Sequence, residues 1–144
     1  MNWPLYELRW AETQHALGPL LKGAKLSWEI APYPHFDTPR GYAVTFLRGD
    51  RTCKLRFSDK IFKAPGHRID GVLRHELGHV VDMSVPAPKL NEWAKRRHVR
   101  LPNTIERRAD AVAEAIWGSP IYYDSDLVQS TSTGVCPRPV HLGL

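Results

Sequence analysis

The pattern of apolar and polar positions predicts a helix first and extended segments after it. Four apolar residues recur with helical spacing within residues 4–21, and Gly18-Pro19 ends that pattern. These four are Leu5, Leu8, Ala16 and Leu17. A short apolar stretch at 26–30 predicts a strand, and the prolines that follow it predict a loop.

Two further strands are predicted to form a hairpin. The segment GYAVTFL at 41–47 is mostly apolar, and Gly49-Asp50 after it supplies a turn. In TCKLRFS, at 52–58, apolar residues alternate with Lys54 and Arg56. This period of two is typical of a strand that is buried on one face only.

The second half of the chain is predicted to be helical. Asp70 is placed to cap a helix that runs to about Met83, before two prolines. Three apolar residues fall in one sector of this helix and are expected to face the core: Leu73, Leu77 and Val80. A short basic helix is expected at 90–98.

The last strong helical pattern opens at Pro102-Asn103. Asn103 and Glu106 have the spacing of a capping box, and Gly118 supplies the stop. Three apolar residues are expected at the centre of its buried face: Ile105, Val112 and Ile116. Glu106 and Asp110 then lie one turn apart on the flank of that face.

Composition narrows the class of protein. The chain has 144 residues, 42% hydrophobic and 24% charged, which suits one globular domain. We predict this domain at 1–123 and a loop-like or partly disordered tail at 124–144, where the sequence is polar and rich in Ser and Thr. No apolar run reaches the roughly 18 residues of a membrane span, and residues 1–18 lack the apolar core of a secretory signal. Two cysteines are too few for a disulfide framework, so we expect a cytoplasmic protein. We also expect a monomer.

The net charge of +5 is concentrated in one segment. Residues 89–108 hold seven basic residues and two acidic ones, so the segment carries 7 − 2 = +5 and the remainder is neutral overall. The seven are Lys89, Lys95, Arg96, Arg97, Arg100, Arg107 and Arg108. Such a patch can attract acidic protein segments or nucleic acid. Because charge runs usually form a solvated face, nucleic acid is the secondary expectation for a partner, after a protein or peptide substrate.

The chemistry lies in RHELGHVVDM, at 74–83. On a helix, His75 and His79 project side by side, which suits two imidazoles binding one metal ion. Glu76 falls near the edge of the same face, within reach of a metal-bound water. Gly78 is expected to leave the backbone uncrowded on the flank nearest the histidines.

A catalytic zinc ion needs a third protein ligand. The downstream candidates are Asp82, His98, Glu106, Asp110 and His141. Metzincin spacing would place glycine at 82 and histidine at 85, where this chain has Asp82 and Val85, so that class is excluded. Carboxylates at the edge of a buried face are costly without a cation or a histidine beside them. We therefore predict Glu106 as the ligand and Asp110 as the partner of a ligand histidine, with His98 as the rival ligand.

The motif HELGH followed by E-x-x-x-D on a later helix resembles the gluzincin metallopeptidases. The shorter form, with ERRADAVAE, is also similar to ImmA/IrrE-type peptidases and minimal single-domain gluzincins. The resemblance covers about 42–117. It implies an α+β, minimal zincin-like fold: an N-terminal helix, a small mostly antiparallel twisted sheet, the motif helix and a second ligand-bearing helix. It also implies the same roles for His75, His79, Glu106 and Asp110.

Together these features predict a zinc metalloendopeptidase. Glu76 is expected to take a proton from the zinc-bound water as general base. Tyr122 or Tyr123 is expected to stabilise the oxyanion, because both closely follow the ligand helix. The other candidate donors are His98, Tyr42 and Arg107. By resemblance, a strand edge would hold the substrate as an added strand; we assign this role to 52–58, with 41–47 as the alternative.

Two other functions remain open at this stage. One is a DNA-associated protease, similar in purpose to the SprT-like group, that docks through 89–108. The other is a zinc-binding regulatory protein without turnover, against which the intact Glu76 argues. An additional hypothesis is that Cys136 in the tail binds the zinc ion and holds the enzyme latent.

Overall fold

The computed structural model describes residues 3–21, 24–31, 43–47, 52–58, 61 and 66–121. In chain order the elements are α1 (Trp3–Leu17), the 3-10 helix η1 (Gly18–Leu21), β1 (Lys25–Ala31), β2 (Ala43–Leu47), β3 (Thr52–Ser58), α2 (Gly66–Ser84), α3 (Ala87–Arg96) and α4 (Ile105–Trp117). The predicted α+β class is confirmed. Among these helices none has both the length and the apolar character that crossing a bilayer requires.

The three strands form one mixed sheet in the order β1-β3-β2. β2 runs antiparallel to β3, from Ala43 opposite Phe57 to Leu47 opposite Cys53, which confirms the predicted hairpin pairing. β1 runs parallel to β3 along its whole length. The prediction of a mostly antiparallel sheet is therefore wrong. β2 runs opposite to β3, whereas β1 runs in the same direction as β3, so one of the two strand pairings is antiparallel and the other is parallel.

β3 is the middle strand, and its burial follows the predicted alternation. Cys53, Leu55 and Phe57 are fully buried, whereas Lys54 and Arg56 are partly exposed. Because β1 and β2 occupy both of its edges, β3 cannot accept a further strand. The assignment of 52–58 as the substrate-binding edge is therefore wrong. Within the described sheet the two edge strands are β1 and β2.

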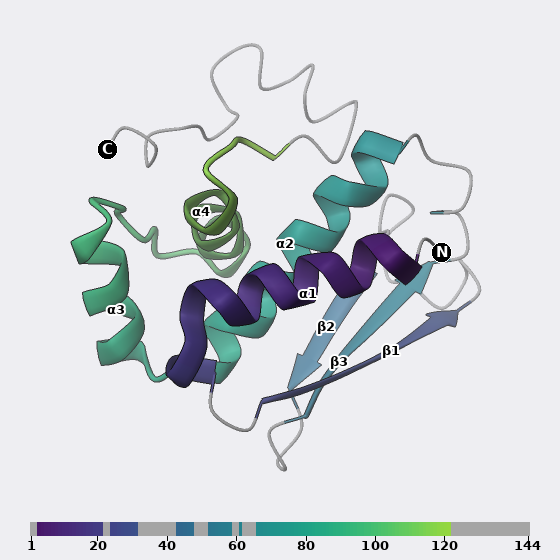
Figure 1. Cartoon of the computed structure of the whole chain (residues 1–144), viewed down its shortest axis with the longest axis horizontal. Helices are drawn as coiled ribbons and strands as arrows, with labels where there is room; N and C mark the ends of the chain where they lie inside the picture. The colour runs from purple at the N-terminus through teal and green to yellow at the C-terminus, as the bar shows by residue number, and fades with distance from the viewer. Residues whose placement is uncertain are drawn as a thin grey trace.

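α2 is the central helix of the fold. Every residue from Gly71 to Val81 is buried, including Leu73, Leu77 and Val80, which confirms that these three face the core. The helix contacts α1, α4 and β2. In Figure 1, α1 passes in front of α2, with the sheet on one side of α2 and α4 on the other. Polar side chains on α2 are consequently buried between neighbouring elements.

Two helices begin differently from the sequence prediction. α2 begins at Gly66, so Asp70 lies inside it, where its carboxylate accepts a hydrogen bond from Arg9 Nε at 2.7 Å. α4 has Thr104 as its N-cap residue and no side-chain capping bond, so the capping box of Asn103 and Glu106 is not formed. The predicted stop is confirmed, because Gly118 ends α4 in the left-handed region with φ 68°.

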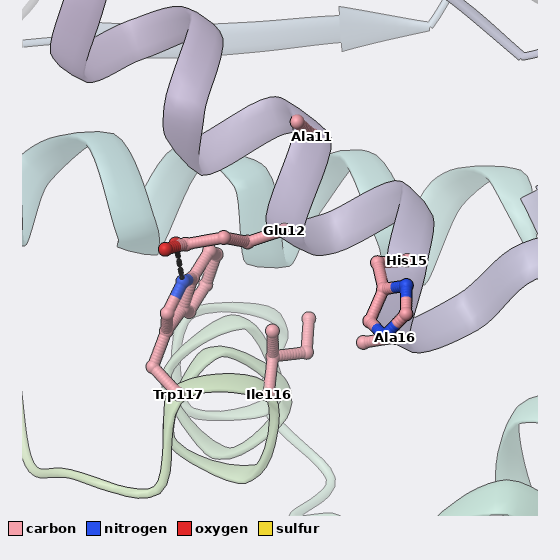
Figure 2. A pocket seen from close by; sticks show the side chains of 6 residues that line it. All are labelled: Ala11, Glu12, His15, Ala16, Ile116 and Trp117. Carbon is pink, nitrogen blue, oxygen red and sulfur yellow. Dashed lines mark hydrogen bonds between the residues drawn. The ribbon is translucent and has the colours of Figure 1, made fainter.

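α1 packs against α2 and α4 with a face that the sequence prediction only partly identified. Tyr6, Thr13 and Leu17 are buried, but Leu8 is 51% exposed. Between α1 and α4 lies a groove of about 500 Å³. Figure 2 shows Glu12 crossing it to accept a hydrogen bond from the indole N–H of Trp117, at 2.6 Å.

Candidate metal centre

Two imidazoles meet on the buried flank of α2. His75 and His79 are one helical turn apart, and their ring centroids lie 4.6 Å apart with an 84° angle between the rings. The two Nε2 atoms are separated by 3.1 Å. Both residues are buried. The helical spacing seen in the sequence therefore directs both nitrogens to one point in space.

The third member of the group comes from α4. Glu106 Oε2 lies 2.9 Å from His75 Nε2, and Glu106 Oε1 lies 3.4 Å from His79 Nε2. With one ligand atom taken from each residue, all three atoms lie within 4.8 Å of one another, so the group can hold a metal ion. The side chain of Glu106 is 72% exposed, which leaves the group accessible from the α4 side.

α4 reaches the histidines because it approaches α2 very closely at Gly78. A Cβ atom placed on Gly78 would collide with the backbone carbonyl of Ala109. The prediction that Gly78 lies on an uncrowded flank is therefore wrong. Its missing side chain is what allows the two helices to touch backbone to backbone. This contact brings residues on both sides of Ala109, namely Glu106 and Asp110, up to α2.

The buried face of α4 is centred differently from the sequence prediction. Ile105 is 64% exposed and Ile116 is only partly buried, whereas Ala109, Val112 and Ala113 are fully buried. Small residues rather than large apolar ones therefore form the contact with α2. Glu106 lies at the edge of this contact, as expected from the sequence, although the predicted buried face of α4 was centred on the wrong residues.

Asp110 fixes the orientation of His75. Its Oδ1 atom lies 2.7 Å from His75 Nδ1, and both side chains are buried. A carboxylate on one ring nitrogen sets the tautomer and leaves the other nitrogen for a ligand. The structure thus brings Asp110 to the place where the sequence predicted a supporting carboxylate.

The carboxylates control the charge of this group. Burial acts against protonation of His75, but its hydrogen bonds to Asp110 and Glu106 raise its pKa to about 10. The same hydrogen bond from His75, with one from His79, holds the pKa of Glu106 well below its usual range. The surroundings therefore favour a positive charge between these carboxylates, whether that of a protonated imidazole or that of a metal ion.

Glu76 lies beside the group. It is 4% exposed, and its Oε1 atom is 3.9 Å from His75 Nε2. Sequence reasoning missed a neighbour of this carboxylate, Tyr6 on α1. Burial, and then the charge of Glu76, raise the pKa of the Tyr6 hydroxyl, which places the phenol and the carboxylate within electrostatic range. No local pattern could have revealed this proximity, because 70 residues separate the two.

The other candidate ligands are elsewhere. Asp82 accepts hydrogen bonds from Arg108, at 2.8 Å from Nη2 and 3.1 Å from Nε. His98 is exposed beyond the end of α3, with a φ of 58°, and is not part of the group. Two further candidate ligands, Cys136 and His141, lie outside the described residues. The candidate oxyanion donors Tyr42, Tyr122 and Tyr123 also lie outside them.

The donor set suits zinc. Two neutral imidazole nitrogens and one carboxylate are a recognised catalytic zinc combination. Tetrahedral coordination with bonds of 2.0–2.1 Å places ligand atoms roughly 3.3–3.4 Å apart. The two Nε2 atoms are 3.1 Å apart, and the Glu106 carboxylate lies across both, with Oε2 2.9 Å from His75 and Oε1 3.4 Å from His79. With one ligand atom from each residue all three lie within 4.8 Å, so side-chain movements alone would fit a zinc ion.

The groove between α1 and α4 contains none of these residues. Its lining is Ala11, Glu12, His15, Ala16, Ile116 and Trp117 (Figure 2).

Comparison of the chain with protein-family models, with curated proteins and with solved structures returns no match. The function of this protein is accordingly inferred from the geometry of His75, His79 and Glu106.

Proposed function

We propose that this protein is a zinc-dependent metallopeptidase in which His75, His79 and Glu106 bind the zinc ion. The observation that carries the proposal is the convergence of these three side chains, from two helices, within 4.8 Å. The buried Glu76 next to His75 supports a catalytic rather than a purely structural site. The resemblance of HELGH and E-x-x-x-D to the gluzincin pattern, and the zincin-like arrangement it implies, point the same way.

A zinc ion, when bound, supplies Lewis acidity that acidifies water and polarises a peptide carbonyl. Glu76 then acts as the general base: its carboxylate accepts a proton from the attacking water and returns it to the departing amine nitrogen. Asp110 keeps the ring of His75 in one orientation through Nδ1. These roles use every buried carboxylate of the group.

For the substrate, the outer edge of β2 is the suitable binding strand. It lies at the edge of the described sheet, and β2 contacts α2, the helix that carries both histidines. An extended peptide that adds to this edge would be held through its backbone. We propose Tyr122 or Tyr123 as the donor that stabilises the oxyanion, because both follow α4 closely in the sequence.

The decisive experiment is the Glu76→Gln substitution, assayed with casein and a peptide library. The amide cannot accept the proton, so we expect zinc content to stay at one ion per chain and cleavage to fall by about 10²–10⁴-fold. Glu92→Gln, the same change at an exposed position on α3, is the control and should leave both unchanged. Cleavage near the wild-type rate in Glu76→Gln would overturn the mechanism.

The same assay separates the second candidate function. A zinc-binding regulatory protein would bind zinc through the same three residues and cleave nothing, with or without chelator. The burial of Glu76 beside the group favours catalysis, because a structural zinc site needs no additional base.

A further inference from the structure

We propose that α3 and the connection to α4 form a binding surface for the sugar–phosphate backbone of a nucleic acid. The basic surface consists of Lys89, Lys95, Arg96, Arg97, Arg100 and Arg107. All six residues are exposed. This binding function goes beyond peptide hydrolysis and does not depend on it.

Four of these cations are not used to hold the fold together. The side chains of Lys89, Lys95, Arg100 and Arg107 are exposed and form no ion pair or hydrogen bond with the described part of the chain. Arg96 approaches Glu92 at 4.0 Å, with both side chains about two-thirds exposed. An exposed pair of that kind contributes little. These charges are therefore available to a ligand.

Arg97 belongs to the basic surface, whereas Arg108 does not. Arg108 is partly buried and neutralised by Asp82, so it belongs to the contact between α2 and α4. Arg97 places its guanidinium 4.4 Å from the centroid of the Trp93 ring. A cation–π contact orders the guanidinium without using its hydrogen-bond donors, which then remain available for phosphate oxygens.

Little negative charge offsets these cations locally. Of the two acidic residues in the segment 89–108, Glu106 is turned toward His75, which leaves Glu92 as the acid on this surface. Soluble domains usually intersperse the two signs, because like charges repel. A cluster of one sign, in a chain whose remainder is neutral overall, indicates a partner of opposite charge.

The surface favours a nucleic acid over a membrane or an acidic peptide. The large apolar residues of α3, Leu90 and Trp93, are buried in the core, so the helix has no apolar face to insert into lipid. Arg clusters also recognise short acidic peptide motifs. The cations here extend over α3, the connection and the start of α4, which suits a long polyanion, and poly-glutamate tests the peptide alternative. Phosphate contacts need only a row of exposed cations, because counterion release supplies the free energy.

The test is fluorescence anisotropy with the full chain and labelled 20-nucleotide probes: duplex DNA, single-stranded DNA and RNA, each titrated from 25 to 200 mM salt. Four or five phosphate contacts predict a slope of log K against log salt of roughly −4 on duplex DNA. The three probes show which nucleic acid presents the phosphates best. Poly-glutamate and anionic vesicles serve as the competing polyanions.

Variants locate the contact. Each of Lys89→Ser, Lys95→Ser, Arg100→Ser and Arg107→Ser should reduce the slope on duplex DNA by about 0.9, and the quadruple variant should bind at least about tenfold more weakly at 50 mM salt. Lys25→Ser, at an exposed lysine on β1, is the matched control and should change neither quantity. Circular dichroism and zinc content establish that each variant is folded.

Three results would overturn the proposal. The first is a slope near zero on all three nucleic acids. The second is tighter binding of poly-glutamate or of anionic vesicles than of any nucleic acid. The third is an equal loss in Lys25→Ser and in the four surface variants. None of these readouts uses peptide cleavage, so failure of this proposal and failure of the peptidase proposal are distinguishable.

Discussion

Two of the polar contacts between α2 and α4 in the described part of the chain differ in how their charges balance. In one, Asp82 pairs with Arg108, so one negative charge meets one positive charge. In the other, Glu76, Glu106 and Asp110 surround His75 and His79. That group carries a net charge of −3 with neutral imidazoles and −1 with both protonated. The first contact is complete in itself, whereas the second has room for a dication.

A third polar contact supports this distinction. Arg9, Glu12, Asp70 and Arg74 join α1 to α2 through ion pairs of 2.7–3.5 Å, and their charges sum to zero. Folding alone can therefore satisfy charged groups around α2 in this protein. Burying excess charge of one sign is costly, so the unbalanced charge around His75 and His79 points to a bound cation there.

The largest expected effect is on metal affinity, when Glu106 is removed. Glu106→Ala deletes a direct ligand and should weaken zinc binding by more than about 100-fold, beyond what loss of a supporting residue costs. His98→Ala is the matched control and should bind zinc as the wild type does, because His98 lies outside the group. Competitive titration with a chromophoric chelator measures both. Equal losses in the two variants would assign the third ligand to His98 instead.

The next effect concerns the residue that orients His75. Asp110→Asn keeps the size of the side chain but removes its charge, and we expect zinc affinity to fall by about 10–100-fold. The same chelator titration reports it. Asp82→Asn makes the identical change in the balanced contact and should leave affinity unaltered. If Asp82→Asn lowered the affinity as much as Asp110→Asn, the two contacts would not be separable as we describe them.

Asp82→Asn should instead show its effect in stability. Loss of its charge-assisted hydrogen bonds to the partly exposed Arg108 should reduce the free energy of unfolding by about 1–3 kcal/mol. Urea denaturation of the zinc-loaded protein measures this. A double-mutant cycle with Arg108→Gln isolates the pair, and a coupling energy near zero would show that the contact adds no stability.

The smallest expected effect is a pH-dependent change in the melting temperature when Glu12 is replaced. Burial would raise its pKa, but hydrogen bonds from Arg9 and Trp117 outweigh burial and lower it. A carboxyl with a lowered pKa stabilises the fold above its ordinary value of 4.5 and loses that contribution as the pH falls below it. Glu12→Gln should therefore lower the melting temperature at pH 6 and do so less at pH 3.5. Glu7→Gln, at an exposed position on α1, is the control and should show no such pH-dependent difference.

Local periodicity correctly predicted which residues of α2 share one face of the helix. The spacing of Leu73, Leu77 and Val80 identified the core face of α2, and that of His75 and His79 placed both imidazoles on one side. These inferences need only the helical repeat, which the sequence contains in full. The predicted hairpin pairing depended on equally short-range information.

Contacts between distant segments were predicted less well. Nothing between residues 25 and 58 indicates that β1 pairs with β3 rather than with β2, because strand order is decided by how the sheet packs. The position of α4 depends on the contact of Gly78 with Ala109, two small residues whose importance appears only when the helices are brought together. Glu106 was chosen correctly as a member of the group, although Ile105 beside it turned out to be exposed.

The unequal exposure of the three proposed ligands has a consequence for metal exchange. The histidines are buried within the central helix, whereas the side chain of Glu106 is 72% exposed, so a rotation of that side chain alone would open the group. A chelator could then strip the ion through a single rotamer change, at a rate unrelated to that of global unfolding. Occupancy would accordingly track the free zinc concentration of the surroundings within the lifetime of one folded molecule.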